Sequence, residues 1–439
     1  MKELTKDFLE KELDVYKQDA SQTIFRHALV KNTLMDVVRT DDDKKDIDFN
    51  FDINVKTMKA TNQKASGRCW IFAATNVMRE KVAKELNLED FELSQSYLAF
   101  YDKLEKCNYF MEAIIGLRDK DYDDRTLSFL LREGVGDGGQ WDMIVSLVNK
   151  YGVCPKNVFD ETANSSNTNA INNLLNFNLR KFASEAHQLA TLEDVLKLKE
   201  VYVKKIYRLL ISLYGVPPVK FNFEYTNKDG ECHREEIASP LAFKEKYLGD
   251  FLDQFVSVIN APTKSKPFNK TYTVEYLGNV VGGKVVTHLN LEMPRLKELV
   301  INQLKDNQIV WFGSDVGFFG DRTGGVWDDK SFDFETPTGL NFFMDKGESL
   351  DYRASAMNHA MCITGVALNK GEATKWKIEN SWGDVNGNKG YYIQSGSWFD
   401  QFVYQAVINK KYLTKEELAL LDKEPIVLKP WDPMGSLAK

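Results

Sequence analysis

The sequence of 439 residues lacks any apolar stretch long enough to cross a membrane. Its beginning, MKELTKDFLEKE, carries charges where a signal peptide requires an apolar core. Cysteine is scarce, with five widely spaced residues, no CxxC pair and no His/Cys cluster of metal-ligand spacing. These absences argue against a membrane protein, a disulfide scaffold and a zinc site, so we expect a cytoplasmic protein that needs no metal or other cofactor.

The sequence also has few histidines, and its acidic residues outnumber its basic ones. The formal net charge is −7, and no nucleic-acid-binding motif occurs, so a nucleic-acid partner is only a minor alternative. Of five histidines, four stand in polar surroundings and are expected at the surface: His27, His187, His233 and His288. The remaining one, His359, requires another explanation.

The most informative stretch that is present runs from Gln63 to Ala74, QKASGRCWIFAA. Gly67 allows a sharp turn, and the apolar run that follows predicts a helix beginning near Cys69. A thiol at a helix N-terminus is favoured as thiolate, and beside an imidazolium its pKa is expected to fall to about 3–4. The side-chain amide of Gln63 and the N–H of Cys69 could stabilise an oxyanion. Because a single cysteine is more often a small buried apolar residue, this interpretation depends on partners.

Two such partners follow much later in the chain. His359 lies in the strand-like run 357–366, and Asn380 lies in the run 376–383. An imidazole can take the thiol proton and return it to the leaving amine, while an amide oxygen holds the other ring nitrogen. Together with Gln63, they predict a catalytic set of Cys69, His359 and Asn380.

These motifs resemble the papain superfamily and, within it, the bleomycin hydrolase and aminopeptidase C family. The matching segments extend from Gln63 to the C-terminus: Gln63–Trp70, Leu93–Gln95, Asp137–Asp142, Asn358–Ala360, Glu379–Gly383, Lys389–Tyr392 and Pro430–Lys439. One departure is Ser66, which stands where ordinary papain-like enzymes have a second cysteine. The resemblance implies an α+β, papain-like fold with a helical half and a β-barrel-like half, extended by a large insertion and by terminal extensions.

The same resemblance implies a cysteine aminopeptidase that cleaves peptides with a free N-terminus through a thioester acyl-enzyme, with bleomycin-type amide hydrolysis as a further activity. It also implies a homohexamer. Substrate-binding positions implied by it are Gly138, Gly139, Trp382, Ala438 and Lys439. The glycine pair is equally compatible with a plain β-turn, and Trp382 with a core tryptophan.

The spacing of the motifs predicts an insertion, because Cys69 and His359 are 290 positions apart, against about 130–150 in compact papain-like chains. Helices are expected over 170–190, 192–214 and 293–306, and strands over 221–225, 271–276 and 309–314. We therefore divide the chain into an N-terminal helical extension (1–60), a helical half with Cys69 (61–160), an inserted region that serves oligomerisation (161–290), a β half with His359 and Asn380 (291–410) and a C-terminal arm (411–439).

The arm contains Pro425, Pro430 and Pro433, which predict an extended strap lying along the cleft toward Cys69. There its carboxylate would bind the substrate ammonium, and the family resemblance implies that Lys439 is trimmed so that Ala438 is the working end. Two alternatives remain open: a papain-like endopeptidase or amide hydrolase with the same residues, and an oligomeric nucleic-acid-binding or scaffold protein. For the latter, the candidate contacts are Lys197, Lys199, Lys204 and Lys205.

Overall fold

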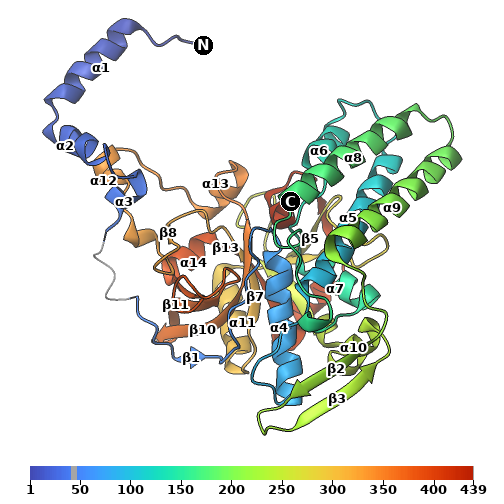
Figure 1. Ribbon diagram of the computed structural model, residues 1–439. Coiled ribbons are helices and arrows are strands. Elements are labelled where there is room, and N and C mark those ends of the chain that lie inside the picture. Colours follow the sequence, from blue (N-terminus) through green and yellow to red (C-terminus); the bar gives the residue numbers. More distant parts are fainter. Residues whose placement is uncertain (41–46, 439) are drawn as a thin grey trace.

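The computed structural model describes residues 1–40 and 47–438, so the predicted roles of Lys439 lie outside the described residues. One long helix, α4, stands in the middle, with most other helices of the first half of the chain on one side and the main sheet on the other (Figure 1). The predicted α+β class, with a helical half and a β-rich half, is confirmed.

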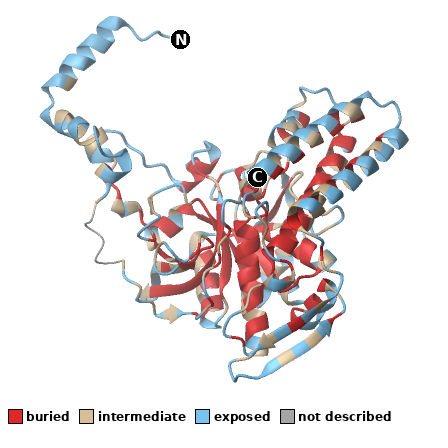
Figure 2. Ribbon diagram, in the orientation of Figure 1, coloured by how far each residue is buried: buried red, intermediate tan, exposed pale blue. Residues whose placement is uncertain are grey.

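Helix α4 (Cys69–Leu86) is buried around nearly its whole circumference. It packs against β10 (His359–Asn369) of the sheet and against α5 (Gln95–Gly116) and α7 (Trp141–Tyr151) of the helical half. Neighbours on both sides explain the apolar composition of its first turns, whereas Lys84 and Glu85 in its last turn are exposed. Asn87 ends it in the left-handed conformation. The interior of both halves meets around this helix (Figure 2).

Helices α8 (Asn169–Gln188) and α9 (Leu192–Tyr214) match the helices expected in the insertion. The apolar stripe of α9 was expected to meet another subunit, and that expectation is wrong for its buried part. Val195, Tyr202 and Leu210 are buried against α5 and α8, because these two helices of the same chain already cover the stripe.

The main sheet joins strands from the predicted insertion to strands of the predicted β half. Its order in the described residues is β14-β5-β6-β4-β13-β7-β10-β11-β12-β9-β8, with β1 paired to β10. The strands are β1 (Ile53–Asn54), β4 (Phe255–Ile259), β5 (Lys270–Val274), β6 (His288–Asn290), β7 (Val310–Ser314), β8 (Gly320–Asp321), β9 (Val326–Trp327), β11 (Glu372–Glu379), β12 (Tyr391–Ser395), β13 (Val403–Asn409) and β14 (Ile426–Leu428). A separate hairpin pairs β2 (Phe221–Thr226) with β3 (Cys232–Ile237). Strand β5 ends before Tyr276, which has a φ of 60°.

His288 corrects an expectation, because it is buried and not at the surface. It lies on β6, between β5 and β4, and its Nδ1 is 2.7 Å from Oγ of Ser257. The polar residues around it in the sequence gave no sign of this, since the burial results from strand pairing.

The N-terminal extension projects from the rest of the molecule (Figure 1). Helices α1 (Lys6–Gln18) and α2 (Ala20–Ala28) have no buried residue, although Gln22 of α2 donates to the carbonyl of Pro337. Further contacts with the body follow α2: the carbonyl of Val38 accepts the N–H of Asp333, and β1 pairs with β10. Phe8, Leu9 and Leu13 on α1 are exposed apolar side chains.

The C-terminal arm is not the continuous extended strap that its prolines suggested. After β14, which pairs with β5, residues Pro433–Ala438 form the 3-10 helix η6. Asp432 begins this turn, because its Oδ1 accepts the N–H of Met434 and its carbonyl accepts the N–H of Gly435. Proline tolerates the first turn of a helix, where its missing N–H is not needed.

The remaining helices cover the sheet or connect its strands. The α-helices are α3 (Leu34–Val38), α6 (Arg125–Glu133), α10 (Pro240–Tyr247), α11 (Met293–Lys305), α12 (Glu335–Thr338), α13 (Lys346–Asp351), α14 (Gly396–Phe402) and α15 (Lys415–Leu421), and the short 3-10 helices are η2 (Lys156–Val158), η3 (Phe251–Gln254), η4 (Asp329–Ser331) and η5 (Lys410–Tyr412). Within the described residues, none of these helices has both the length and the apolar character needed to span a bilayer.

Candidate active site

Cys69 is the first residue of α4, as the sequence predicts, and its side chain lies at the boundary with the sheet. Its Sγ accepts the N–H of Ala360, the second residue of β10, at 3.4 Å. Only 4% of Cys69 is exposed. The N-terminal end of α4 and the Ala360 amide both direct partial positive charge at the sulfur.

His359 directly precedes Ala360, the residue whose N–H contacts the thiol. Its Nε2 is 2.8 Å from Oδ1 of Asn380, which follows β11. The same Oδ1 accepts the N–H of Ser381, at 2.8 Å, which identifies the atom as the oxygen. Because an amide oxygen only accepts, Nε2 of His359 carries the proton, and Nδ1 is the nitrogen left to exchange a proton with Cys69.

Gln63 is held by the sheet half as well. Its Oε1 accepts from Oγ of Ser381 at 2.7 Å, and its Nε2 donates to the carbonyl of Ser66 at 2.6 Å. Its backbone N–H also donates to the carbonyl of Ser381. These bonds use one of the two amide hydrogens of Gln63 and fix the side chain, so the second hydrogen is still available as a donor.

Burial governs the ionisation of both reacting groups. It raises the pKa of the Cys69 thiol to about 11, against the opposing effect of the Ala360 N–H. It also lowers the pKa of the His359 imidazole to about 4, although the bond to Asn380 favours the protonated ring. The expected thiol pKa of about 3–4 therefore does not describe Cys69 ionising alone. A thiolate at Cys69 would need an imidazolium as its partner, since two opposite charges compensate for their lost solvation.

Trp382 covers the imidazole, with 4.8 Å between the ring centroids of His359 and Trp382. The guanidinium of Arg322 lies over the ring of Trp382, 4.5 Å from its centroid. Arg322 belongs to the β8–β9 turn and was not singled out from the sequence. Its positive charge also contributes to lowering the pKa of His359.

The glycine pair 138–139 precedes α7. Gly139 is needed for packing inside the protein, and not only to leave room for a substrate. A Cβ placed on Gly139 would lie 2.4 Å from Cε2 of Trp70, the residue after Cys69. The segment therefore packs directly on the start of α4, and any larger residue at 139 would displace it.

The C-terminal arm reaches this region. Oγ of Ser436 donates to the carbonyl of Met357, two residues before His359, and the carbonyl of Met434 accepts from Gln140, the residue after the glycine pair. Ala438 lines a cavity of about 90 Å³ together with Gly136. The end of the described chain thus lies between the segments that carry His359 and the glycine pair.

The helix with Cys69 and the strand before Asn380 are joined by a buried ion pair that sequence reasoning missed. Oε1 of Glu379 is 2.7 Å from the guanidinium of Arg79 and accepts from Asn76 at 2.8 Å, both on α4. In the sequence, Glu379 stands in one of the matching segments, and its position next to Asn380 is the feature that could have pointed to its role.

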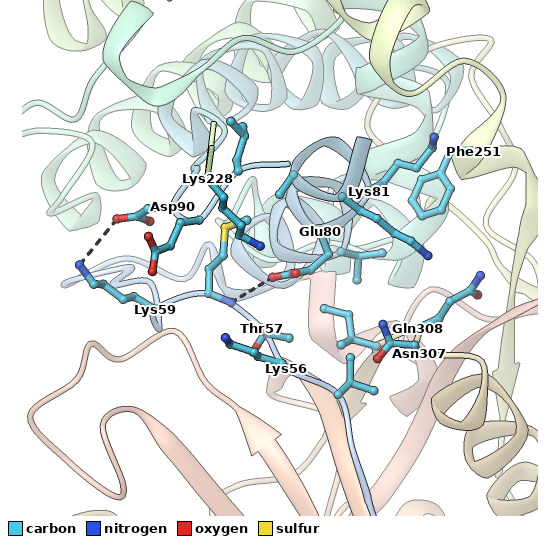
Figure 3. Close-up of a pocket in the computed structure, with 18 of the residues that line it drawn as sticks. Lys56, Thr57, Lys59, Glu80, Lys81, Asp90, Lys228, Phe251, Asn307 and Gln308 are labelled. Carbon is cyan, nitrogen blue, oxygen red and sulfur yellow. Dashed lines mark hydrogen bonds and ion pairs between the residues drawn. The ribbon is translucent and has the colours of Figure 1, made fainter. Parts of the chain in front are cut away.

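A second hollow lies at the opposite end of α4 (Figure 3). This cavity, of about 1060 Å³, is lined by Lys81 and Glu80 of α4 and by Phe251, and none of the candidate catalytic residues faces it. Lys59 and Asp90 form an ion pair at its edge. Nowhere in residues 1–40 and 47–438 do three or more His, Cys, Asp or Glu side chains come together in a way that could hold a metal ion.

Comparisons with known proteins show the family to which this chain belongs. The model of the peptidase C1-like family matches residues 3–435. Aminopeptidase C of Lactobacillus delbrueckii subsp. lactis is 47% identical over 100% of this chain and 99% of its own length. Bleomycin hydrolase of Homo sapiens is 40% identical over 86% of both chains. The crystal structure of PepW from Lactobacillus rhamnosis is 44% identical and superimposes over 99% of both chains with a TM-score of 0.96. This chain belongs to the peptidase C1-like family.

Proposed function

We propose that this protein is a cysteine aminopeptidase that releases residues from the N-termini of peptides. The observation that carries the proposal is the meeting of three segments: the start of α4 with Cys69, the hydrogen-bonded pair of His359 and Asn380, and the C-terminal arm beside them. Curated relatives of similar length are named aminopeptidase C, which supports this activity.

The side chains suit a two-step acyl transfer. Nδ1 of His359 takes the thiol proton while Sγ of Cys69 forms a bond to the scissile carbonyl carbon. The amide of Gln63 and the N–H of Cys69 stabilise the oxyanion. The imidazolium then protonates the leaving amine, the C–N bond breaks and a thioester remains. Water attacks the thioester and gives a proton to His359; the C–S bond breaks and the thiol is restored.

The C-terminal arm would make this an aminopeptidase instead of an endopeptidase. An arm lying between the segments of Met357 and Gln140 occupies part of the cleft, so that a substrate can extend only a short way past the thiol. A carboxylate at its end would bind the α-ammonium of the substrate in a buried site. Trimming of Lys439 to expose Ala438 is part of this proposal.

The scaffold and nucleic-acid alternative receives little support. Lys197, Lys199 and Lys204 form ion pairs with Glu193, Glu112 and Glu200, which leaves less positive charge for phosphates.

We further propose a homohexamer in the cytoplasm. Exposed apolar residues on α1 offer a contact surface, and the five unpaired cysteines fit a reducing compartment.

The test compares a fluorogenic aminoacyl amide carrying a free amino group with its N-acetylated form. We expect cleavage of the free form only, a loss of at least about 1000-fold in kcat for Cys69→Ala, and no loss for the matched control Cys232→Ala, because Cys232 is exposed and far along the chain. Removal of residues 436–439 should allow cleavage of the acetylated form. Equal activity of Cys69→Ala, or a truncated protein that still rejects the acetylated substrate, would contradict the respective part of the proposal.

A further inference from the structure

Asp137 holds the residues on both sides of Cys69. Its Oδ2 accepts the backbone N–H of Gly67, at 2.9 Å, and its carbonyl oxygen accepts the indole N–H of Trp70, at 2.6 Å. Asp137 also directly precedes the glycine pair 138–139, which lies on Trp70. A single buried residue therefore connects the loop before the nucleophile, the residue after it and the proposed substrate-binding segment.

The carboxylate of Asp137 is itself fixed from four directions. Oδ1 is 2.5 Å from Nζ of Lys103 and 3.1 Å from Nδ2 of Asn172, while Oδ2 also accepts from Oγ1 of Thr168 at 2.5 Å. Lys103 is 1% exposed and Asp137 8%. Burial alone would raise the pKa of Asp137, but the Lys103 ammonium and these hydrogen bonds outweigh it and hold the pKa far below its usual value. The group is therefore a permanent anion with every oxygen paired.

Lysines also fix the backbone on either side of Asp137. The carbonyl of Gly136 accepts from Lys103 at 2.9 Å, and the carbonyl of Gly138 accepts from Lys106 at 2.5 Å. Lys106 is buried and paired with Asp102 at 2.7 Å. Because the carbonyls of 136, 137 and 138 all have donors inside the protein, the segment has little freedom to shift along α4.

The contact with Gly67 depends on the missing side chain there. A Cβ placed on Gly67 would lie 2.9 Å from Cβ of Asp137, closer than two such atoms approach each other in real structures. Gly67 is thus required so that Asp137 can come close enough to accept its N–H. This is a different reason from the sharp turn for which the sequence suggested it.

We infer that Asp137 is a positioning residue that sets the distance between the substrate-binding segment 138–139 and the sulfur of Cys69. The inference rests on the proposed function. A peptide bound along this segment presents its carbonyl carbon to Sγ only when the two are in register. A displacement of about 1 Å in such a pair lowers turnover by about 100-fold while leaving binding intact.

Two double variants separate positioning from stability. Lys103→Met with Asp137→Leu removes the acceptor for Gly67 without leaving a buried charge unpaired. Lys103→Met with Asp137→Asn keeps an oxygen for Gly67 and Thr168, while its amide can donate to Asn172. We expect the Leu variant to lose at least about 30-fold in kcat for an aminoacyl amide with KM within about threefold, and the Asn variant to stay within about fivefold of the parent.

Alkylation of Cys69 by iodoacetamide is the second readout, because this small reagent does not use the segment 138–139. Its rate should not fall in the Leu variant. The matched control, Arg295→Met with Glu417→Gln, neutralises the ion pair between α11 and α15 and should retain kcat. If the Leu variant does not fold, Gly67→Ala should show the same split, since the added methyl group pushes Asp137 away.

Three results would overturn the positioning role: an unchanged kcat in the Leu variant, a parallel fall of kcat and alkylation, or an Asn variant as impaired as the Leu variant. Absence of turnover in the parent protein refutes the proposed function and the positioning role together. Turnover in the parent that the Leu variant retains refutes the positioning role alone.

Discussion

At the scale of single residues, the reacting pair is shaped by burial more than by charge. Cys69 and His359 are each nearly enclosed, and burial disfavours the charged form of each one alone. Asn380 sets which ring nitrogen faces the thiol, and Ser381 sets which atom of Asn380 faces the ring. In the proposed mechanism, Nδ1 is therefore the atom that would pass its proton to the leaving amine.

This pair predicts a broad pH profile with its acid limb at low pH. The folded pKa of His359 is lowered to about 4, so the productive one-proton state of the pair persists as pH falls and is lost only when a second proton binds near or below pH 4. We expect kcat/KM to stay on its plateau to about pH 4.5 in stopped-time assays, with circular dichroism to verify folding. An acid limb near pH 6.5 in the folded enzyme would contradict this account.

At the scale of elements, the C-terminal arm is held by contacts well before its end. Trp431 receives the guanidinium of Arg125 from α6, 3.8 Å from the ring centroid, and Asp432 pairs with the buried Lys266 at 3.0 Å. The pairing of β14 with β5 sets the direction of the arm before these contacts. The position of η6 next to Met357 and Gln140 thus depends on residues farther from Cys69.

Weakening the contacts of Trp431 should change the substrate specificity and leave the chemistry of Cys69 unchanged. Trp431→Ala removes both the cation–π contact and the ring contact with Phe129, at a cost of about 1–3 kcal/mol to the docked arm. We expect weaker selectivity for free amino groups. The ratio of kcat/KM for the free substrate to kcat/KM for the N-acetylated substrate should fall at least about tenfold below that of the parent. Trp431→Phe serves as the control and should retain most of the selectivity. A ratio unaffected by Trp431→Ala would mean that the anchor does not hold the arm.

At the scale of the whole molecule, two features lie outside the catalytic region. The N-terminal extension carries α1 away from the body, and α1 is coloured as exposed (Figure 2). Its exposed residues include the apolar Phe8, Leu9 and Leu13. The buried His288 lies inside the main sheet, and its Nε2 has no hydrogen-bond partner among the described residues. The first bears on assembly and the second on stability.

Assembly should depend on α1. Exposed apolar residues on an amphipathic helix are stabilised when another subunit covers them. Replacing Phe8, Leu9 and Leu13 with serine should shift the species seen by light scattering from a hexamer of the 50.3 kDa chain to smaller forms. Replacing the polar Lys11 and Glu12 with glutamine is the matched control and should leave assembly unchanged. A parent protein that is monomeric at micromolar concentration would refute the hexamer.

Stability should fall as the pH drops below about 6.5. Burial lowers the folded pKa of His288 from 6.5 to about 4, so the unfolded chain binds a proton that the folded chain does not. Stability from this group is complete above pH 6.5 and is lost progressively down to about pH 4, by about 3 kcal/mol. His288→Asn should reduce this dependence in thermal unfolding measured from pH 7 to pH 4.5, while the contribution of His359, whose pKa burial lowers in the same way, remains. A slope equal to that of the parent would show that His288 does not contribute.

The sequence alone determined the local features of this protein. The bounds of α9, the start of α4 at Cys69 and the order of Gln63, Cys69, His359 and Asn380 are encoded by residue spacing and short motifs, which act over a few positions. Only the tertiary structure decided what covers the stripe of α9, that His288 is buried and that burial raises the thiol pKa. It also showed why Gly67 and Gly139 are glycines. These properties depend on contacts such as that between Gly67 and Asp137, which are 70 positions apart, and no local pattern specifies which distant residue will arrive there.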